Sequence, residues 1–153
     1  MDLKKRIQEG GIHVDNRGVI RFINEFPRGV KRMYQVENLR AGRIRAWHGH
    51  MEEAKYVYVP GGIVEVKIIG MKPGVWGGYI PSGPSSHIVS FVLSSMKPSI
   101  LHIPPRYYNG FKTLTDDAII QFFSTSTLEE SKKDDQRLPW DHFGKEVWEE
   151  KNN

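Results

Sequence analysis

The lengths of the apolar runs are the strongest constraint on the fold. The runs are short, alternate apolar with polar residues, end at Gly, Pro, Asn or Ser, and rarely keep a helical period for long. Many short strands separated by such turn residues predict an all-β sandwich or jelly roll. We predict strands over residues 19–24, 31–38, 44–50, 55–59, 63–69, 88–93, 99–103, 110–114 and 118–124.

Helical signals occur only near the ends of the chain. They cover residues 2–8, the turn 126–130 with a Ser-x-x-Glu capping pattern, and residues 143–150. Residues 70–86 hold five glycines and three prolines, so we predict a long loop there. Within this loop, Trp76 and Tyr79 could cover a ligand or anchor the loop to the body or to a second subunit.

A chain of 153 residues can bury one hydrophobic core, so we predict a single domain over 1–153, with its core at about 14–141 and a tail or helix at 142–153. The absence of cysteine excludes disulfides, thiolate metal sites and a cysteine nucleophile. No apolar run is long enough for a membrane span. Because no apolar stretch follows the charged N-terminus, we predict no secretory signal and a cytoplasmic location.

Basic residues gather just before the histidine pair. The formal net charge is +4, yet no helix-turn-helix, zinc-finger or RNP pattern accompanies it, so we expect no nucleic-acid partner. A small anion such as a diphosphate fits the same charge, and a solvated surface is the alternative interpretation. The cluster consists of Arg28, Lys31, Arg32, Arg40, Arg43 and Arg45.

The histidine pair lies in a regular frame: Gly42, five residues, His48-Gly49-His50, four residues, Lys55, six residues and Gly62. In a strand, His48 and His50 project to the same face. This frame resembles the first cupin motif, with Lys55 in place of the metal-binding glutamate. Asn109 takes the place of the histidine of the second motif. Because an ammonium repels a divalent ion, we expect neither a metal nor another cofactor, and a metal-dependent cupin is the less favoured alternative.

Several further motifs follow in order along the chain. Together with the histidine frame they resemble the RmlC-like cupins, which comprise dTDP-4-keto-6-deoxyhexose 3,5-epimerases and 3,4-ketoisomerases. The motifs are Asp15-Asn16-Arg17-Gly18, Lys31-Arg32-Met33-Tyr34, Arg45-Ala46-Trp47-His48, Ile103-Pro104, Asn109-Gly110-Phe111, Thr113-Leu114-Thr115-Asp116 and Pro139-Trp140-Asp141.

The resemblance implies a cupin jelly roll and proton abstraction next to a 4-keto group, in a pathway to surface polysaccharide. It implies His48 as the base, His50 as its helper, Lys55 facing the enolate and Asp141 orienting a histidine. A nucleotide sugar, with dTDP as the expected nucleotide, would be the substrate, and a homodimer the assembly. The implied substrate-binding residues are Arg17 and Arg45 for the diphosphate, with Tyr34, Asn109 and Phe111.

Two positions depart from the family pattern. The epimerases carry a tyrosine acid where this chain has Phe122, which disfavours a full 3,5-epimerase and leaves a 3,4-ketoisomerase, a single-centre epimerase or a non-catalytic sugar-nucleotide-binding protein. Tyr34, Tyr107 and Tyr108 could replace that acid or serve only in packing. Strand parity places Arg45 opposite to His48, so a bulge or a strand end between them is needed if both face the ligand.

Overall fold

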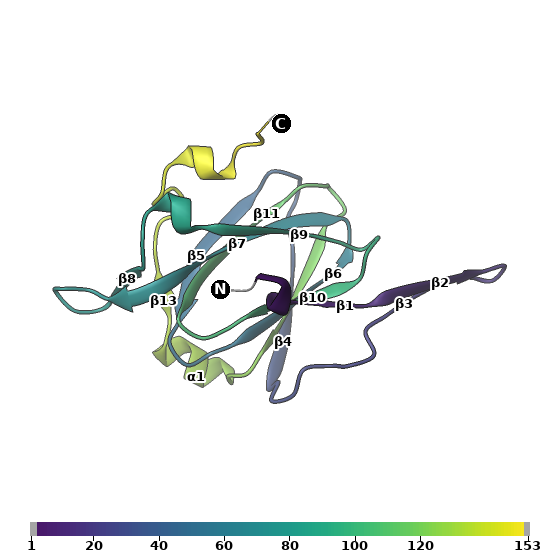
Figure 1. The fold of residues 1–153 in the computed structure, drawn as a ribbon, viewed down its shortest axis with the longest axis horizontal. Helices are drawn as coiled ribbons and strands as arrows, with labels where there is room; N and C mark the ends of the chain where they lie inside the picture. Colours follow the sequence, from purple (N-terminus) through teal and green to yellow (C-terminus); the bar gives the residue numbers. More distant parts are fainter. Residues whose placement is uncertain (1–2, 152–153) are drawn as a thin grey trace.

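Two facing antiparallel sheets form the body of the molecule in the computed structural model, which describes residues 3–151 (Figure 1). Their strands curl around a shared interior, so the predicted all-β jelly roll is confirmed. The first sheet has the spatial order β1 (Ile7–Glu9), β10 (Ser99–Ile103), β6 (Lys55–Gly61), β12 (Ile119–Ser124) and β4 (Arg32–Glu37).

The second sheet is centred on the longest strand, β7. One long side of β7 pairs with β11, while its other side pairs with β9 and, further along, with β8. The strands of this sheet are β13 (Gln136–Arg137), β5 (Ile44–His50), β11 (Tyr107–Thr113), β7 (Ile63–Pro73), β8 (Tyr79–Pro81) and β9 (Val89–Ser94). A separate hairpin of β2 (Gly11–Asp15) and β3 (Gly18–Phe22) projects from the body (Figure 1).

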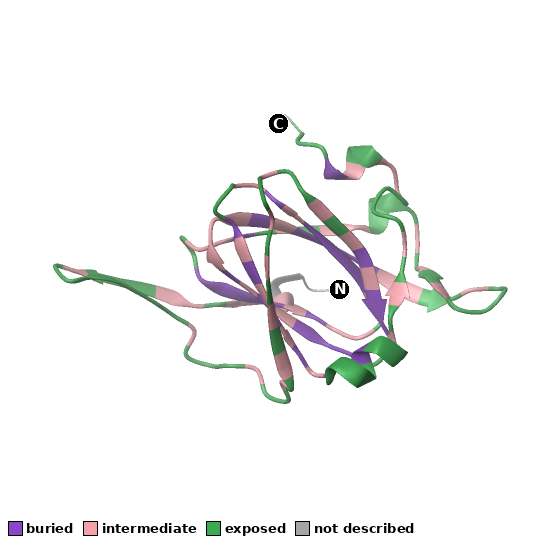
Figure 2. Cartoon of the chain, turned by 180° about the vertical axis from the view of Figure 1, so that it is seen from behind, coloured by how far each residue is buried: buried purple, intermediate pink, exposed green. Residues whose placement is uncertain are grey.

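The core lies between the two sheets and follows the two-residue period of the strands. In β6, Lys55, Val57 and Val59 are buried while the residues between them are only partly covered. In the neighbouring strand β12, Ile120 and Phe122 lie on the buried face. Figure 2 shows this alternation as bands of buried and partly buried residues along the strands. Burial of these aliphatic and aromatic side chains supplies the main stabilisation of the fold.

A second apolar cluster covers the outer face of the second sheet. It joins Trp47 of β5, Ile69 of β7 and Tyr108 of β11 to Trp148 near the C-terminus. Trp148 is only 2% exposed, and Lys112 Nζ donates to its carbonyl oxygen at 2.7 Å. The C-terminal segment therefore belongs to the folded domain and packs on the sheet.

All nine predicted strands exist, and four short ones were missed. Strands β1, β2, β8 and β13 lack a long alternating pattern, and each is two to five residues long and pairs with one neighbouring strand. The predicted loop over residues 70–86 is wrong in part. Strand β7 continues to Pro73 and turns back into β8, which makes a hairpin with Trp76 99% exposed near its tip.

The helical predictions are confirmed only in part: the two near the ends of the chain are four-residue 3-10 helices, and Ile7 and Gln8 of the first one lie in strand β1. The turn at residues 126–130 begins helix α1 (Leu128–Lys133), but its capping box joins Thr127 to Glu130, one residue later than the Ser-x-x-Glu pattern indicated. Short 3-10 helices occupy η1 (Leu3–Arg6), η2 (Ser85–His87) and η3 (Lys145–Trp148). Asp2 of the first predicted helix lies outside the described residues. Within 3–151, no helix is long and apolar enough to cross a bilayer.

Candidate active site

A cavity of about 340 Å³ is lined by residues of β4 from the first sheet and β5 from the second, with α1 beside it. Both sheets contribute walls, and charged or polar groups outnumber the apolar ones. The lining residues are Arg32, Tyr34, Val36, Arg45, His48, His50, Lys55, Asn109, Phe111, Phe122, Leu128, Ser131, Lys132, Asp135 and Arg137. Seven of the nine residues that the sequence predicted as site residues therefore meet in one place.

A β-bulge at Trp47 allows Arg45 and His48 of strand β5 to face the same side, although regular alternation would place them on opposite faces. Asn109 of β11 pairs with His48, but the next residue, Gly110, pairs with Ala46, so Trp47 is the extra residue. Beyond it, Arg45 is opposite Phe111. Because directly paired residues project to the same face, Arg45 and His48 both face the cavity while Trp47 enters the outer cluster.

His48 is partly buried, and its surroundings disfavour the charged form. Burial, followed by the charges of Lys55 and Arg137, lowers the pKa of His48 to about 4, while Asp135 opposes the shift. The imidazole is therefore neutral at pH 7 and has a nitrogen free to accept a proton.

His50 lies deeper, beside a buried carboxylate. Its Nδ1 is 3.2 Å from Oε2 of Glu53. The two atoms are at ion-pair distance without the alignment of a hydrogen bond, and neither has another hydrogen-bond partner among residues 3–151. Burial and Lys55 lower the pKa of His50, whereas Glu53 opposes this shift. Sequence reasoning missed the role of Glu53, although its spacing from His50 is visible in the HGHMEE stretch.

Lys55 and Asn109 occupy the positions at which a metal-binding cupin has ligands. Burial lowers the pKa of Lys55, whose Nζ lies 5.9 Å from the centre of the Phe122 ring and has no carboxylate at ion-pair distance among the described residues. Asn109 Nδ2 donates to the backbone carbonyl of His48 at 3.0 Å. Residues 3–151 contain no group of three His, Asp or Glu side chains placed to hold a metal ion. This arrangement suits an anionic or carbonyl oxygen better than a divalent cation.

Tyr34 faces the cavity from the wall opposite to the histidines. It is the cross-strand neighbour of Phe122, and the two rings stack with centroids 4.9 Å apart. Burial, and then the charge of Glu53, raises the pKa of Tyr34 above its usual value, so the phenol keeps its proton. Tyr107 and Tyr108 do not line this cavity; Tyr108 OH instead donates to the Tyr79 carbonyl oxygen at 2.7 Å.

Two predicted site residues lie away from the cavity of their own chain. Arg17 is at the turn of the projecting β2–β3 hairpin, where it pairs with Asp15 at 2.7 Å. Asp141 is exposed in the C-terminal segment that leads to Trp148 on the outer face of the sheet. Among the described residues of one chain, Glu53, Asp134 and Asp135 are the carboxylates whose charges act on the histidines.

The basic end of the cavity includes residues that sequence reasoning did not select. Lys132 comes from α1 and Arg137 from β13, which pairs with His48 of β5. The other additions are Val36, Leu128, Ser131, Asp135 and Arg32; of these, Arg32 had been noted in the basic cluster and in the Lys31-Arg32-Met33-Tyr34 motif. No local pattern marks the residues of α1 and β13, because they reach the site only when these elements dock on the second sheet.

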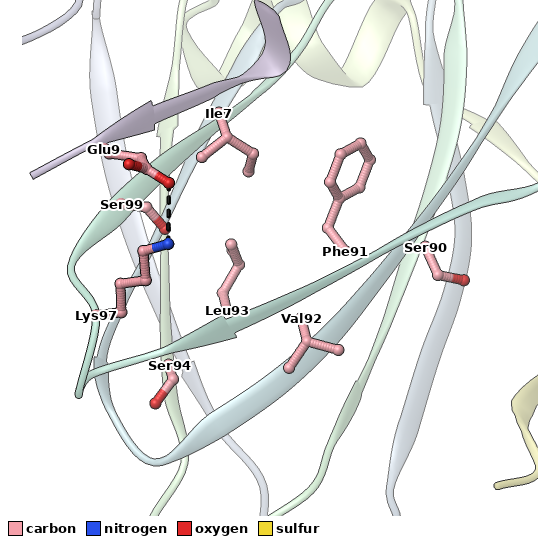
Figure 3. Close-up of a pocket in the computed structure, with 9 residues that line it drawn as sticks. All are labelled: Ile7, Glu9, Ser90, Phe91, Val92, Leu93, Ser94, Lys97 and Ser99. Carbon is pink, nitrogen blue, oxygen red and sulfur yellow. Dashed lines mark ion pairs between the residues drawn. The ribbon is translucent and has the colours of Figure 1, made fainter. Parts of the chain in front are cut away.

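A larger cavity of about 900 Å³ opens elsewhere, between strands β1 and β9 (Figure 3). Its floor is apolar, with Ile7, Phe91 and Leu93, and its two charged groups, Glu9 and Lys97, pair with each other at 2.9 Å. Because it holds neither a histidine nor an unpaired charge, the smaller cavity is the candidate active site.

Solved structures, but no sequence family, are similar to this chain. No protein-family model matches this sequence. No curated protein matches it either. Among solved structures, dTDP-4-dehydrorhamnose 3,5-epimerase from Bacillus anthracis, with TDP and pyrophosphate bound, has a TM-score of 0.72 and 18% identity over 92% of this chain and 81% of that one. These two chains therefore share a fold although their sequences have diverged widely.

Two further structures extend this likeness. The ketoisomerase QdtA from Thermoanaerobacterium thermosaccharolyticum, in complex with TDP, has a TM-score of 0.66 and 14% identity over 92% of each chain. The 3'-monoepimerase ChmJ from Streptomyces bikiniensis, in complex with dTDP-quinovose, has a TM-score of 0.69 and 20% identity over 88% of this chain and 70% of that one. The molecule therefore has the RmlC-like cupin fold, as its motifs predicted.

Proposed function

We propose that this protein is a cytoplasmic, metal-independent isomerase or epimerase of a nucleotide-linked 4-keto-6-deoxy sugar, in a pathway to surface polysaccharide. The observation that carries the proposal is one cavity that holds two histidines with lowered pKa values and a buried lysine. Arg45, Lys132 and Arg137 form a basic rim at this cavity. The similar structures with bound TDP, TDP with pyrophosphate, and dTDP-quinovose support dTDP as the nucleotide.

The reaction begins at a carbon next to the 4-keto group. His48 removes the carbon-bound proton, and the electron pair of the broken C–H bond becomes the enolate. The ammonium of Lys55, which is only 5% exposed, faces the developing oxyanion, and a buried charge stabilises it more than a solvated one would. Return of a proton to carbon then gives the product, with no net oxidation or reduction.

The available proton carriers favour a 3,4-ketoisomerase or a single-centre epimerase. Ketoisomerisation moves one proton between two carbons and another between two oxygens, so His48 and His50 would carry one each. Inversion at one carbon requires a donor on the opposite face, and Tyr34 supplies a protonated phenol from the opposite wall. Phe122 cannot donate a proton at the position where the 3,5-epimerases have tyrosine.

The diphosphate would bind at the basic rim. Arg45 and Arg137 come from neighbouring strands, and Lys132 approaches from α1. Guanidinium groups can grip a diphosphate through paired hydrogen bonds, and the anion would also neutralise part of the charge that now disfavours protonated His48. Asn109 and Phe111 would contact the sugar between this rim and the histidines.

Solvent-deuterium incorporation into a dTDP-4-keto-6-deoxy sugar tests the proposal. We expect the wild-type protein to catalyse exchange and His48→Ala to lower its rate by about 10²- to 10⁴-fold, the usual contribution of a general base. His87→Ala is the matched control, because His87 is exposed and lies outside this cavity. Exchange that persists undiminished in His48→Ala would refute the assignment of the base.

A second candidate is a non-catalytic protein that binds sugar nucleotides. Phe122 in place of the family tyrosine favours it, since binding needs the basic rim but no acid. Titration with dTDP followed by NMR, together with the exchange assay, separates the two candidates. Binding at the cavity without exchange on any 4-keto substrate would support the binding protein and contradict the enzyme.

We further propose that the protein is a homodimer in which the β2–β3 hairpin contacts the second copy. Every residue of β3 is exposed, and an isolated two-stranded hairpin is only marginally stable in water. Val14 and Ile20 are 65% and 57% exposed, which leaves apolar surface to be covered. In such a dimer Arg17 would reach a diphosphate only at the partner's cavity.

A further inference from the structure

The buried carboxylate of Glu53 has a specific set of partners. Its side chain is fully buried, and Oε1 accepts from Arg32 Nη2 at 3.2 Å and from the hydroxyl of Ser124. The other oxygen, Oε2, has no hydrogen-bond partner in the described part of the chain and lies 3.2 Å from Nδ1 of His50. A carboxylate without solvent is costly unless such partners satisfy it, so its position is determined by these three groups.

The turn that carries Glu53 is fixed on both sides. The backbone N–H groups of Met51 and Glu52 donate to the carboxylate of Asp134, at 2.9 and 2.8 Å, where α1 ends. On the other side, the N–H of Ala54 donates to Thr125 Oγ1 at 2.9 Å. Glu53 is therefore held against His50 by the backbone of the turn as well as by its own contacts.

The Glu53 carboxylate favours one of the two ring nitrogens of His50 as the site of the proton. An ionised carboxylate has no proton to donate, and its charge 3.2 Å from Nδ1 favours a proton on that nitrogen of a neutral His50. Nε2, on the far side of the ring, then has a lone pair and no hydrogen-bond partner among the described residues, while His50 lines the cavity. The carboxylate also stabilises the imidazolium that forms when Nε2 takes up a proton.

We propose that Glu53 is a positioning residue that holds His50 in the Nδ1–H tautomer and presents Nε2 to the substrate as a proton acceptor. The inference rests on the proposed function for its catalytic meaning, but the tautomer itself does not. It also gives His50 a definite part, as the histidine whose charged form has a carboxylate partner.

The charged groups around His50 are consistent with this role. Burial and the charge of Lys55 of β6 disfavour a proton on the ring, whereas Glu53 and the two carboxylates after α1, Asp134 and Asp135, favour it. Asp134 is already engaged by the two backbone N–H groups, and Asp135 pairs with Arg137 at 2.8 Å. Glu53 is therefore the only one of these carboxylates with an oxygen directed at the His50 ring.

Nitrogen-15 NMR of the full chain tests the tautomer without substrate. In the wild-type protein near pH 7.5 we expect His50 as the Nδ1–H form. In Glu53→Gln, Arg32 and Ser124 still require the amide oxygen as acceptor, so the amide NH₂ faces His50 Nδ1. We therefore expect the ring to switch to the Nε2–H form, and its pKa to fall because the carboxylate is lost.

Activity measurements give the second readout. We expect Glu53→Gln to lower kcat for deuterium exchange by about tenfold or more while KM stays unchanged, since the lost interaction acts on proton transfer rather than on binding. Glu52→Gln is the matched control, because Glu52 is adjacent but exposed. It should change neither the tautomer nor kcat.

The two proposals fail in different ways. A wild-type His50 in the Nε2–H form would overturn the positioning role, as would a Glu53→Gln variant that keeps the Nδ1–H form. The wild-type spectrum alone decides the first point, even if the variant does not fold. The expected tautomers without any proton exchange would instead overturn the enzyme assignment and leave the arrangement of Glu53 and His50 supported.

Discussion

Burial and cationic neighbours decide the protonation state of His48. The folded protein lowers its pKa to about 4, whereas the unfolded chain returns it to about 6.5. Between these values the unfolded state binds more protons, so stability must rise with pH. The base of the proposed reaction is therefore kept neutral at a cost in stability that appears only in acid.

We expect the free energy of unfolding to increase as the pH rises from about 4 to 6.5. His48 should account for about 2 to 3 kcal/mol of that increase, because a fall of the pKa from 6.5 to about 4 at about 1.4 kcal/mol per pKa unit sets the upper limit and solvent screens part of it at this partly exposed ring. Urea denaturation at several pH values measures it, with His48→Gln as the comparison. Equal pH slopes for the two proteins would contradict the lowered pKa of His48.

Helix α1 forms one side of the cavity mouth, although it has only six residues. A helix this short is not stable on its own, so its ends must be fixed by specific contacts. The Thr127–Glu130 capping box fixes its start, and Asp134 links its end to the turn after His50. The position of Lys132 in the site depends on these two attachments.

The register of the capping box is testable with two neighbouring substitutions. Thr127→Ala should lower the free energy of unfolding by about 1 kcal/mol, since its hydroxyl accepts from the Glu130 N–H. Ser126→Ala, which the sequence pattern had favoured as the cap, should cost clearly less, because its hydroxyl makes no such contact. Thermal denaturation followed by circular dichroism compares them; equal losses would contradict the observed register.

Local patterns predicted those elements and site residues whose evidence lies within one strand. Alternation marked all nine long strands, and the spacing from Gly42 to Gly62 marked His48, His50 and Lys55. The bulge was inferred only as a requirement for Arg45. The pairing of Glu53 with His50 and the approach of Arg137 could not be predicted, because strand docking and helix placement create them across long sequence separations.

At the scale of the whole molecule, the most unusual feature is the β2–β3 hairpin, which extends beyond the two-sheet body (Figure 1). All five residues of β3 and three of the five residues of β2 are exposed, whereas strands such as β6 and β12 bury every second residue in the core. The hairpin therefore leaves apolar side chains such as Val14 and Ile20 uncovered in a single copy of the chain.

We expect Val14→Asp to shift the protein from dimer to monomer, because a charge in the proposed contact would have to be desolvated. Val75→Asp is the matched control, since Val75 is also highly exposed near the tip of a hairpin, the one between β7 and β8. Analytical ultracentrifugation gives the mass of each variant. A monomeric wild-type protein, or equal dissociation of both variants, would refute this interface.

The bulge at Trp47 separates the residues proposed to bind the nucleotide from those proposed to transfer protons. The histidines lie on one side of the extra residue and Arg45 on the other. The alternation of side chains between the two faces of the sheet therefore restarts at the bulge, and each half of the strand sets its own side-chain directions. Deletion of one residue at the bulge would turn Arg45, the proposed diphosphate ligand, outward without altering the direction of the histidines. Gain or loss of one residue is thus enough to uncouple nucleotide recognition from proton transfer, and the same scaffold could acquire new ligands without rebuilding its chemistry.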